Sequence, residues 1–249
     1  MNKYQIVETM QKNQHAGSKA REDVAFFAKE AGYKPLYIKC RFIKNMSFSE
    51  RALKYVKPFF SWFGAFLKIK KNSVVLIQNP FYNRQLGREF FIKKLKKAKK
   101  CTIISVVHDA EILRGSLWSD KSTQNEFDFM KSKSDYFIVH NEFMKKAFSE
   151  RGFAEESLIP LGIFDYRTDG RISAKEADEN TADIIVAGNL RPEKCPYVYM
   201  LGNIENGPSV NLYGPNYTGD AENDRIKYKG SFPSEEIPEI INGRFGLIW

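Results

Sequence analysis

Two histidines follow apolar runs that are typical of buried strands. His108, with Asp109 beside it, follows Thr102–Val107, and His140 follows Asp135–Val139. A histidine or an aspartate in such a place can take a proton from a substrate or hydrogen-bond a phosphate or hydroxyl group. It can equally be a structural loop residue. Both interpretations stay open for His108 and Asp109, whereas a structural role is favoured for His140.

A second group of polar residues follows the apolar run Ile184–Ala187. Gly188 and Asn189 come first, and the cations Arg191 and Lys194 come next, before a helical pattern. Ligands of parallel sheets bind outside the carboxyl ends of the strands, and a helix N-terminus favours anions. The pattern indicates a turn that handles a phosphate, in particular that of a sugar nucleotide. An ordinary turn with two solvated cations is the alternative, which this stretch alone favours.

The segments around these residues alternate between strand and helix patterns. Ser18 is expected to cap a helix over Lys19–Ala31, and further helices are expected over Arg88–Lys100 and Asn141–Gly152. The remaining strands of the first part are expected at Tyr4–Val7, Pro35–Lys39, Ser73–Gln78 and Leu158–Phe164. Alternation of this kind predicts an α/β fold with parallel sheets.

A second α/β unit begins at the turn that carries Arg191. Its helix is expected to place Tyr197, Val198, Met200 and Leu201 on one face. Later elements are expected at Val210–Tyr213, Ile226–Phe232, Pro233–Ile241 and Phe245–Trp249.

The polar stretch between the two units reads as a linker. We expect an N-terminal domain over residues 1–166, a linker over 167–181 and the start of a C-terminal domain over 182–249. The last apolar strand, Phe245–Trp249, has no helix after it to cover it. We therefore expect the second domain to be incomplete and the natural chain to continue.

The segment Ser47–Lys71 is both aromatic and basic. Its helical stripe consists of Leu53, Val56, Phe60, Phe63 and Leu67 and is interrupted by Pro58. One interpretation is an interfacial helix on an anionic membrane, with Trp62 and the lysines at headgroup level. The favoured alternative is a core-packing helix with a solvated basic edge.

Composition excludes several classes of protein. The 249 residues are 43% hydrophobic and 14% aromatic, which excludes global disorder. Three scattered cysteines favour buried thiols in a reducing cytoplasm over a disulfide framework or a metal site. The N-terminus has no signal-peptide pattern, and no apolar run is long enough to span a membrane.

Charge is distributed unevenly along the chain. The net charge is +9, but residues 1–100 hold 23 Lys and Arg against 6 Asp and Glu. The basic half could face anionic lipid, nucleic acid or a phosphorylated substrate. The lysine run from Lys93 to Lys100 comes with no known RNA- or DNA-binding motif, so nucleic acid is not expected as a partner.

The ensemble of short motifs resembles a known family. The sequence is similar to the bacterial glucosyltransferases that extend O-linked sugars on serine-rich adhesins, and to the related β-1,6-galactofuranosyltransferases of surface polysaccharide synthesis. Seven segments carry the resemblance: Gly17-Ser18, Val107–Arg114, Ile138–Met144, Val186–Leu190, Leu212–Gly214, Tyr228–Gly230 and Phe245–Trp249. It covers almost the whole chain and implies two Rossmann-like domains in the GT-B arrangement.

The resemblance implies a metal-independent hexosyltransferase that uses a UDP-sugar donor and needs no cofactor. Asn189 and Arg191 would meet the diphosphate, Lys194 is a weaker candidate, and Tyr213-Gly214 would border the nucleotide. Gly17-Ser18 would approach the donor. If the transfer inverts the anomeric centre, Asp109 is expected to be the base, with His108 second. The acceptor would be a glycan, either lipid-linked or protein-linked.

Other functions stay open beside the transferase. A catalytically silent GT-B-like interaction module, or an inactive fragment that partners an active transferase, is the main alternative. A dinucleotide-binding oxidoreductase is least favoured, because GxGxxG is absent from the place where a first βα turn would carry it. We expect a cytoplasmic protein, and contact with the inner face of the membrane and self-association into a homo-oligomer stay open.

Overall fold

The computed structural model describes residues 1–9, 16–40, 48–81, 85–110, 113, 121–162, 167, 181–201, 204, 206–219, 225–232 and 243–248. Within this set, the side chains of 16–18, 48–54, 122 and 243–248 are not described. The chain forms two compact units, whose main parts are Gly17–Tyr166 and Arg167–Trp249. No helix of the described ranges is both long and apolar enough to cross a bilayer.

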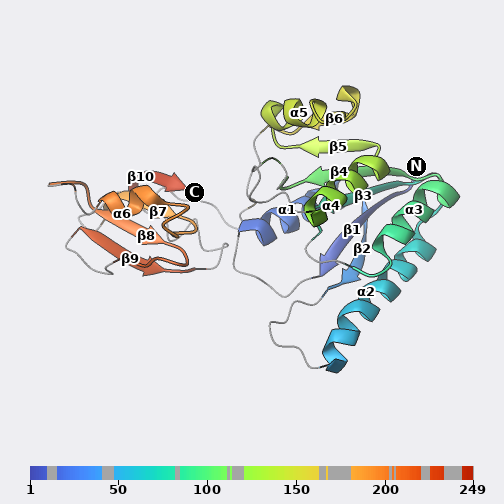
Figure 1. Cartoon of the computed structure of the whole chain (residues 1–249), viewed down its shortest axis with the longest axis horizontal. Coiled ribbons are helices and arrows are strands. Elements are labelled where there is room, and N and C mark those ends of the chain that lie inside the picture. Colours follow the sequence, from blue (N-terminus) through green and yellow to red (C-terminus); the bar gives the residue numbers. More distant parts are fainter. Residues whose placement is uncertain are drawn as a thin grey trace. The chain divides into compact units, whose positions relative to one another are not determined.

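The first unit is built on a six-stranded parallel sheet (Figure 1). Its strands are β1 (Lys3–Thr9), β2 (Lys34–Lys39), β3 (Val74–Asn79), β4 (Thr102–Val107), β5 (Tyr136–Val139) and β6 (Leu158–Pro160). The strand order is β2-β1-β3-β4-β5-β6, so the direction of winding reverses between β1 and β3. Every residue of β3 is buried, as its uninterrupted apolar run predicts for a strand covered on both faces.

Helices cover both faces of this sheet. They are α1 (Ala16–Glu30), α2 (Phe48–Lys68), α3 (Arg88–Lys99), α4 (Lys121–Lys133) and α5 (Glu142–Ser149), with the short 3-10 helix η2 (Glu155–Ser157). Trp62 of α2 and Phe91 of α3 pack with Ile103 on one face. On the other face, Ala28 of α1 packs with Leu76 and Val106. Helices packed on both faces of the sheet are what a doubly wound α/β unit requires.

The start of α1 and the existence of α4 differ from the expectations. Helix α1 begins at Ala16, so Ser18 lies in its first turn and the prediction that Ser18 is the N-cap is wrong. Helix α4 is absent from the sequence interpretation, because only Phe127 and Met130 supply its buried face among many polar residues. By contrast, Asn141 caps α5 as expected, accepting a hydrogen bond from the Met144 amide at 2.9 Å.

Helix α2 buries a different face from the one its apolar stripe predicts. Trp62, Ala65 and Ile69 lie in the core, and Trp62 Nε1 donates to Gln85 Oε1 at 2.7 Å. The placement of Trp62 at membrane headgroup level is therefore wrong. Of the predicted stripe, Val56, Phe60, Phe63 and Leu67 lie exposed on the opposite face, and the side chain of Leu53 is outside the described set. Pro58 does not interrupt the helix.

The second unit holds a four-stranded parallel sheet. Its elements are β7 (Ala182–Ala187), α6 (Pro196–Met200), β8 (Val210–Tyr213), β9 (Ile226–Gly230) and β10 (Gly243–Ile248). The order β10-β7-β8-β9 places a second reversal of winding between β7 and β10. Val198 is buried on α6 as expected, but Met200 is 66% exposed, because residues two positions apart lie about 200° apart around a helix. The helix expected over 233–241 lies outside the described residues.

Candidate functional site

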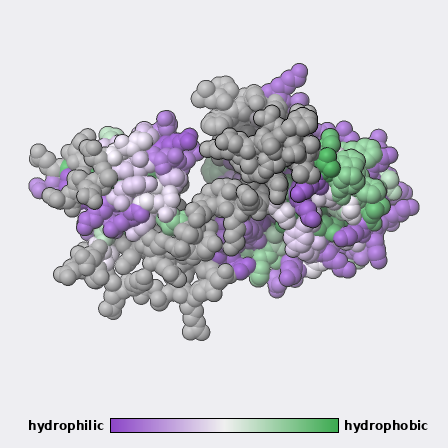
Figure 2. Space-filling model, turned by 90° about the horizontal axis from the view of Figure 1, so that it is seen from below, coloured by the Kyte–Doolittle hydropathy of each residue, from purple (hydrophilic) through white to green (hydrophobic). Residues whose placement is uncertain are grey.

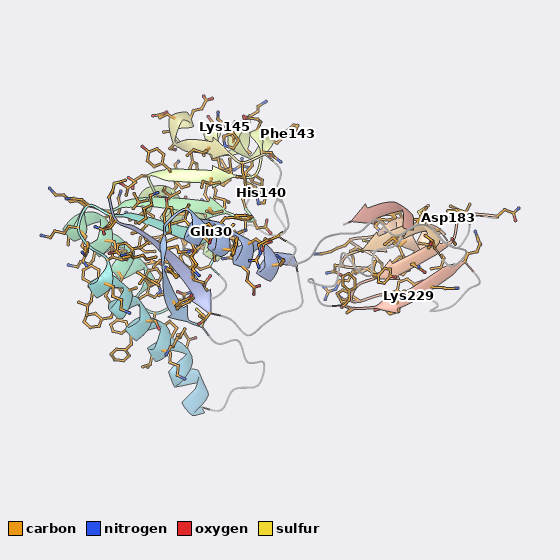
Figure 3. The ribbon with its side chains drawn as sticks, turned by 180° about the vertical axis from the view of Figure 1, so that it is seen from behind. Glu30, His140, Phe143, Lys145, Asp183 and Lys229 are labelled. Atoms are coloured by element: carbon orange, nitrogen blue, oxygen red, sulfur yellow. The ribbon has the colours of Figure 1, made fainter. Side chains whose placement is uncertain are left out.

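The two histidines meet at the carboxyl edge of the first sheet. Strands β4 and β5 are neighbours, and His140 Nε2 donates a hydrogen bond to the backbone oxygen of His108 at 2.8 Å. Figure 3 labels His140 at this edge, with Phe143 on the helix that follows. The strand ends thus bring His108, Asp109 and His140 together, as their spacing in the sequence suggests.

The His108 ring is held in its neutral form. Its Nε2 lies 2.6 Å from Gln78 Oε1, while Gln78 Nε2 donates to the backbone oxygen of Arg21 at 3.3 Å. The second contact fixes the orientation of the Gln78 amide, so His108 Nε2 carries the proton and donates it to Gln78. Burial, then the Arg21 cation and His140, lower the pKa of His108 to about 3. A ring with that pKa is a weak base, so a role in positioning suits His108 better than proton abstraction.

Asp109 is the other candidate base at this edge. It directly follows His108 and is half-buried. A carboxylate at the end of a central strand can accept the proton of a hydroxyl group that approaches the sheet edge. The low pKa of His108 argues against that residue as the base, so Asp109 stays the first candidate, as the sequence predicts.

A buried carboxylate that the sequence interpretation missed lies at the winding reversal. Glu8, near the end of β1, accepts hydrogen bonds from Gln85 and from Arg21 Nη1, the latter at 3.4 Å. Cys40 Sγ lies 3.8 Å from Glu8 Oε1, and burial, followed by the nearness of this carboxylate, raises the pKa of Cys40 to about 12. Arg21 also donates to the backbone oxygen of Pro80. In the sequence, Glu8 could have been found as a carboxylate that directly follows the predicted strand Tyr4–Val7.

A groove of about 360 Å³ opens beside this carboxylate, along α1. Its lining includes the polar residues Glu8, Arg21 and Gln78 and the aromatic residues Tyr37 and Phe81. The reversal point of a parallel α/β sheet is where ligands of such folds bind. The first unit thus offers a polar, aromatic-lined groove next to the His108 edge.

In the second unit, the turn after β7 is fixed in place by its neighbours. Leu190 is fully buried in the core of this unit. Its amide donates to the Pro215 oxygen at 3.0 Å, and its own oxygen accepts from Tyr199 Oη at 2.6 Å. Cys195 Sγ lies 3.3 Å from the backbone oxygen of Asn189. A turn held on both sides presents its side chains without further ordering, which favours ligand binding.

Two glycines allow this turn to approach the end of β8. Gly188 N donates to the Tyr213 oxygen at 2.9 Å, and Gly214 N donates to the Gly230 oxygen at 2.8 Å. Gly214 has φ +139°, and a Cβ atom there would lie 1.7 Å from the Gly188 oxygen. Only glycine fits at position 214. The fold therefore requires Gly214 whether or not this residue borders a nucleotide.

The cations of the turn are exposed at the winding reversal. Arg191 and Lys194 both point to solvent, and the Lys194 amide donates to the Arg191 oxygen at 2.9 Å within one tight turn. Asn189 Oδ1 lies 3.2 Å from Asn216 Nδ2 and accepts from the Arg191 amide at 3.4 Å. Burial raises the pKa of the half-buried Tyr213. The arrangement can hold an anion by side-chain charge.

The N-terminus of α6 contributes little to anion binding at this turn. Helix α6 has five residues and begins with Pro196 after Cys195, which offers no side-chain cap. Helices of little more than one turn carry little aligned dipole, so Arg191 and Lys194 must supply most of the positive potential.

The remaining predicted residues are placed as follows. Gly17 and Ser18 lie in the first turn of α1, and their side chains are outside the described set. In the part of the chain that the structure describes, no three His, Cys, Asp or Glu side chains form a group that could hold a metal ion.

Comparison with known sequences covers both units. Residues 3–163 match the N-terminal domain of the glucosyltransferase 3-like family, and residues 184–249 match its C-terminal domain. The curated protein "Beta-1,6-galactofuranosyltransferase WbbI" of Escherichia coli strain K12 is 30% identical over 191 residues. That alignment spans 75% of this chain but 52% of the relative, so the chain covers about half the relative's length.

Comparison with solved structures identifies the fold. The complex of Anabaena Alr3699/HepE with UDP and glucose has a TM-score of 0.56 at 10% identity, covering 96% of this chain and 72% of the other. The apo form of the lipopolysaccharide outer core galactosyltransferase WaaB has a TM-score of 0.55 at 11% identity, with coverage of 96% and 72%. The expected α/β class with Rossmann-like units of the GT-B type is confirmed.

Proposed function

The chain belongs to the glucosyltransferase 3-like family, and from this premise we propose that the protein transfers a hexose from a UDP-sugar to a glycan acceptor. Glucose and galactofuranose are the two candidate sugars, since a family domain and the E. coli relative carry these names. The acceptor would be a lipid-linked or protein-linked glycan of a bacterial surface polysaccharide or glycoprotein.

One observation supports the donor site above all. The rigid turn from Gly188 to Lys194 presents two exposed cations at the reversal of winding in the second sheet. In the proposed reaction, the bond between sugar and diphosphate breaks and negative charge collects on the diphosphate. Arg191, with Lys194 in a lesser role, would stabilise that charge without a metal ion. Asn189 would hydrogen-bond the diphosphate, and Tyr213 and Gly214 would border the nucleotide.

The first unit would bind the acceptor and activate its hydroxyl group. Asp109 would take the proton of the attacking hydroxyl group if the reaction inverts the anomeric centre. His108, neutral and tied to Gln78, would hold the edge in place. The groove lined by Arg21, Gln78 and Tyr37 offers the polar and aromatic surface on which sugar rings are bound.

We place the protein in the cytoplasm, in peripheral contact with anionic membrane. The three cysteines are buried free thiols, which suits a reducing compartment.

A thermal-shift titration with UDP, with NAD as the control nucleotide, tests the proposal. Ligands that bind the folded state raise the unfolding temperature, and the stabilisation grows with the logarithm of the ligand concentration divided by the dissociation constant. We expect a rise with UDP and none with NAD. A rise with UDP accompanied by UDP release from UDP-glucose or UDP-galactofuranose supports the transferase. Binding of UDP without turnover of either sugar would favour a silent binding module, and no rise would contradict the donor site.

A further inference from the structure

Helix α2 is apolar on two opposite faces. Trp62 is 1% exposed and packs in the core, whereas Val56, Phe60, Phe63 and Leu67 are 43%, 62%, 44% and 62% exposed. Their spacing of three and four residues places these four side chains along one stripe of the helix. A helix on the surface of a globular unit needs one apolar face for the core, so the second face is left for another partner.

The exposed stripe continues onto α3. Phe63 lies 6.1 Å, ring centre to ring centre, from the buried Phe91, and Phe91 lies 5.2 Å from Phe90. Phe90 is itself 54% exposed. Figure 2 shows hydrophobic surface bordered by hydrophilic side chains on the part of the first unit that holds these helices. Single exposed apolar residues need no explanation, but a contiguous patch marks an interaction surface.

Lysines border this patch on both sides. Lys39, Lys57 and Lys68 line a groove of about 500 Å³ between α2 and β2, which also contains Val56 and Phe60. On the other side, Lys94 Nζ stands 5.5 Å from the centre of the Phe90 ring.

Acidic residues are almost absent from this region. Residues 51–100 contain fourteen lysines and arginines and one acidic residue, Glu89. Glu89 Oε2 lies 3.7 Å from Lys93 Nζ, and Arg88 Nη2 is 4.0 Å from Glu89 Oε1. The Glu89 carboxylate is thus already surrounded by cations, and the described side chains around this patch carry a net positive charge.

We propose that this face is a docking surface for an anionic lipid bilayer. The α2 surface, as we name it, consists of Val56, Phe60, Phe63, Leu67 and Phe90 with Lys57, Lys68 and Lys94. Apolar side chains enter the boundary between headgroups and acyl chains, while lysines beside them contact lipid phosphates. Binding would hold the first unit against the membrane, where a lipid-linked acceptor would be presented. The inference rests on the membrane contact proposed above and names the surface that makes it, but it is independent of the donor site, because it needs neither UDP nor catalysis.

Other occupants fit the surface less well. A second copy that uses the same patch in a two-fold dimer would place the lysines of one chain against those of the other, and like charges across an interface are unfavourable. Nucleic acid would pair with the lysines but would leave Phe60 and Leu67 without a partner.

Cosedimentation of the full chain with vesicles tests the proposal. Vesicles of phosphatidylcholine with phosphatidylglycerol are compared with vesicles of phosphatidylcholine alone. We expect binding to the anionic vesicles, weakened by added salt because salt screens the lysines. The double variant Phe60→Ser/Leu67→Ser should bind roughly tenfold more weakly, since two largely exposed apolar side chains no longer enter the lipid. Lys57→Gln/Lys68→Gln should lose about tenfold as well.

Matched control variants distinguish binding through the α2 surface from nonspecific binding to vesicles. Phe143→Ser removes a phenylalanine that is 86% exposed on α5, and Lys146→Gln removes an exposed lysine of the same helix. Both should bind vesicles like the unchanged protein. Equal binding by the α2-surface variants and the controls, or no binding to anionic vesicles, would overturn the proposal. So would a loss of self-association in Phe60→Ser/Leu67→Ser with vesicle binding unchanged, which would assign the surface to a second copy.

Discussion

The carbonyl oxygen of Gly188 lies 1.7 Å from the place that a Cβ atom on Gly214 would occupy. The turn that carries Arg191 and the end of β8 therefore touch backbone to backbone, and the absence of a side chain at Gly214 allows this contact. The proposed diphosphate-binding turn takes its shape from a residue 26 positions after Gly188 in the chain.

Substitution Gly214→Ala should destabilise the second unit. The methyl group would force the Gly188 carbonyl away, so we expect a loss of about 3 kcal/mol or more, at the upper end for single substitutions. Gly230→Ala is the matched control, because Gly230 also has positive φ, +82°, but nothing lies within 4 Å of its added Cβ. We expect about 1–2 kcal/mol there, from backbone conformation alone. Urea unfolding followed by circular dichroism measures both, and equal losses would contradict the account.

His108 should make stability depend on pH. Its folded-state pKa of about 3 lies below the ordinary 6.5, so the unfolded chain takes up the proton first as the pH falls. The stabilisation is complete above pH 6.5 and is lost progressively toward pH 3. Relative to His108→Gln, the unchanged protein should lose about 1.4 kcal/mol of unfolding free energy per pH unit in that window. Chemical unfolding of both proteins at several pH values measures this, and parallel curves would show that the ring is not buried in its neutral form.

Asp109→Asn should abolish most catalysis while leaving nucleotide binding intact. An amide of the same size cannot accept the proton of an attacking hydroxyl group or water, so the rate should fall by about 10²–10⁴-fold. Release of UDP from UDP-glucose measures the rate, and calorimetry measures UDP affinity. Asp128→Asn, an exposed position on α4, should leave both unchanged. A rate within twofold of the unchanged protein (about 0.4 kcal/mol in barrier) would remove Asp109 from the role of base.

Local sequence patterns predicted most of the architecture. The apolar runs that became β3 and β4, the Asn141 cap and the alternation of elements all carry their signal within a few neighbouring residues. The same holds for the position of His108, Asp109 and Arg191, because residues that follow strands of a parallel sheet gather at one edge.

Features that depend on tertiary contacts were not predictable in this way. Glu8 and Gln85 meet across 77 positions of the chain, and no local pattern links them. The burial of Trp62 in place of Phe60 is decided by which face of α2 meets the sheet, and both faces are apolar. Helix α4 was missed because its buried side chains, Phe127 and Met130, gain their packing from β5 and α5 rather than from a strong stripe of their own.

The donor site at the Gly188–Lys194 turn is the central claim, and calorimetric titration of UDP into the full chain tests it most directly. We predict that UDP binds and that Arg191→Ala weakens binding by about 1.5–3 kcal/mol, the loss of a charged hydrogen bond, or roughly 10- to 150-fold in the dissociation constant. Lys227→Ala removes an exposed cation of the same unit, on β9, and should leave the affinity unchanged. Unchanged UDP affinity in Arg191→Ala, or an equal loss in Lys227→Ala, would contradict the assignment of this turn to the diphosphate.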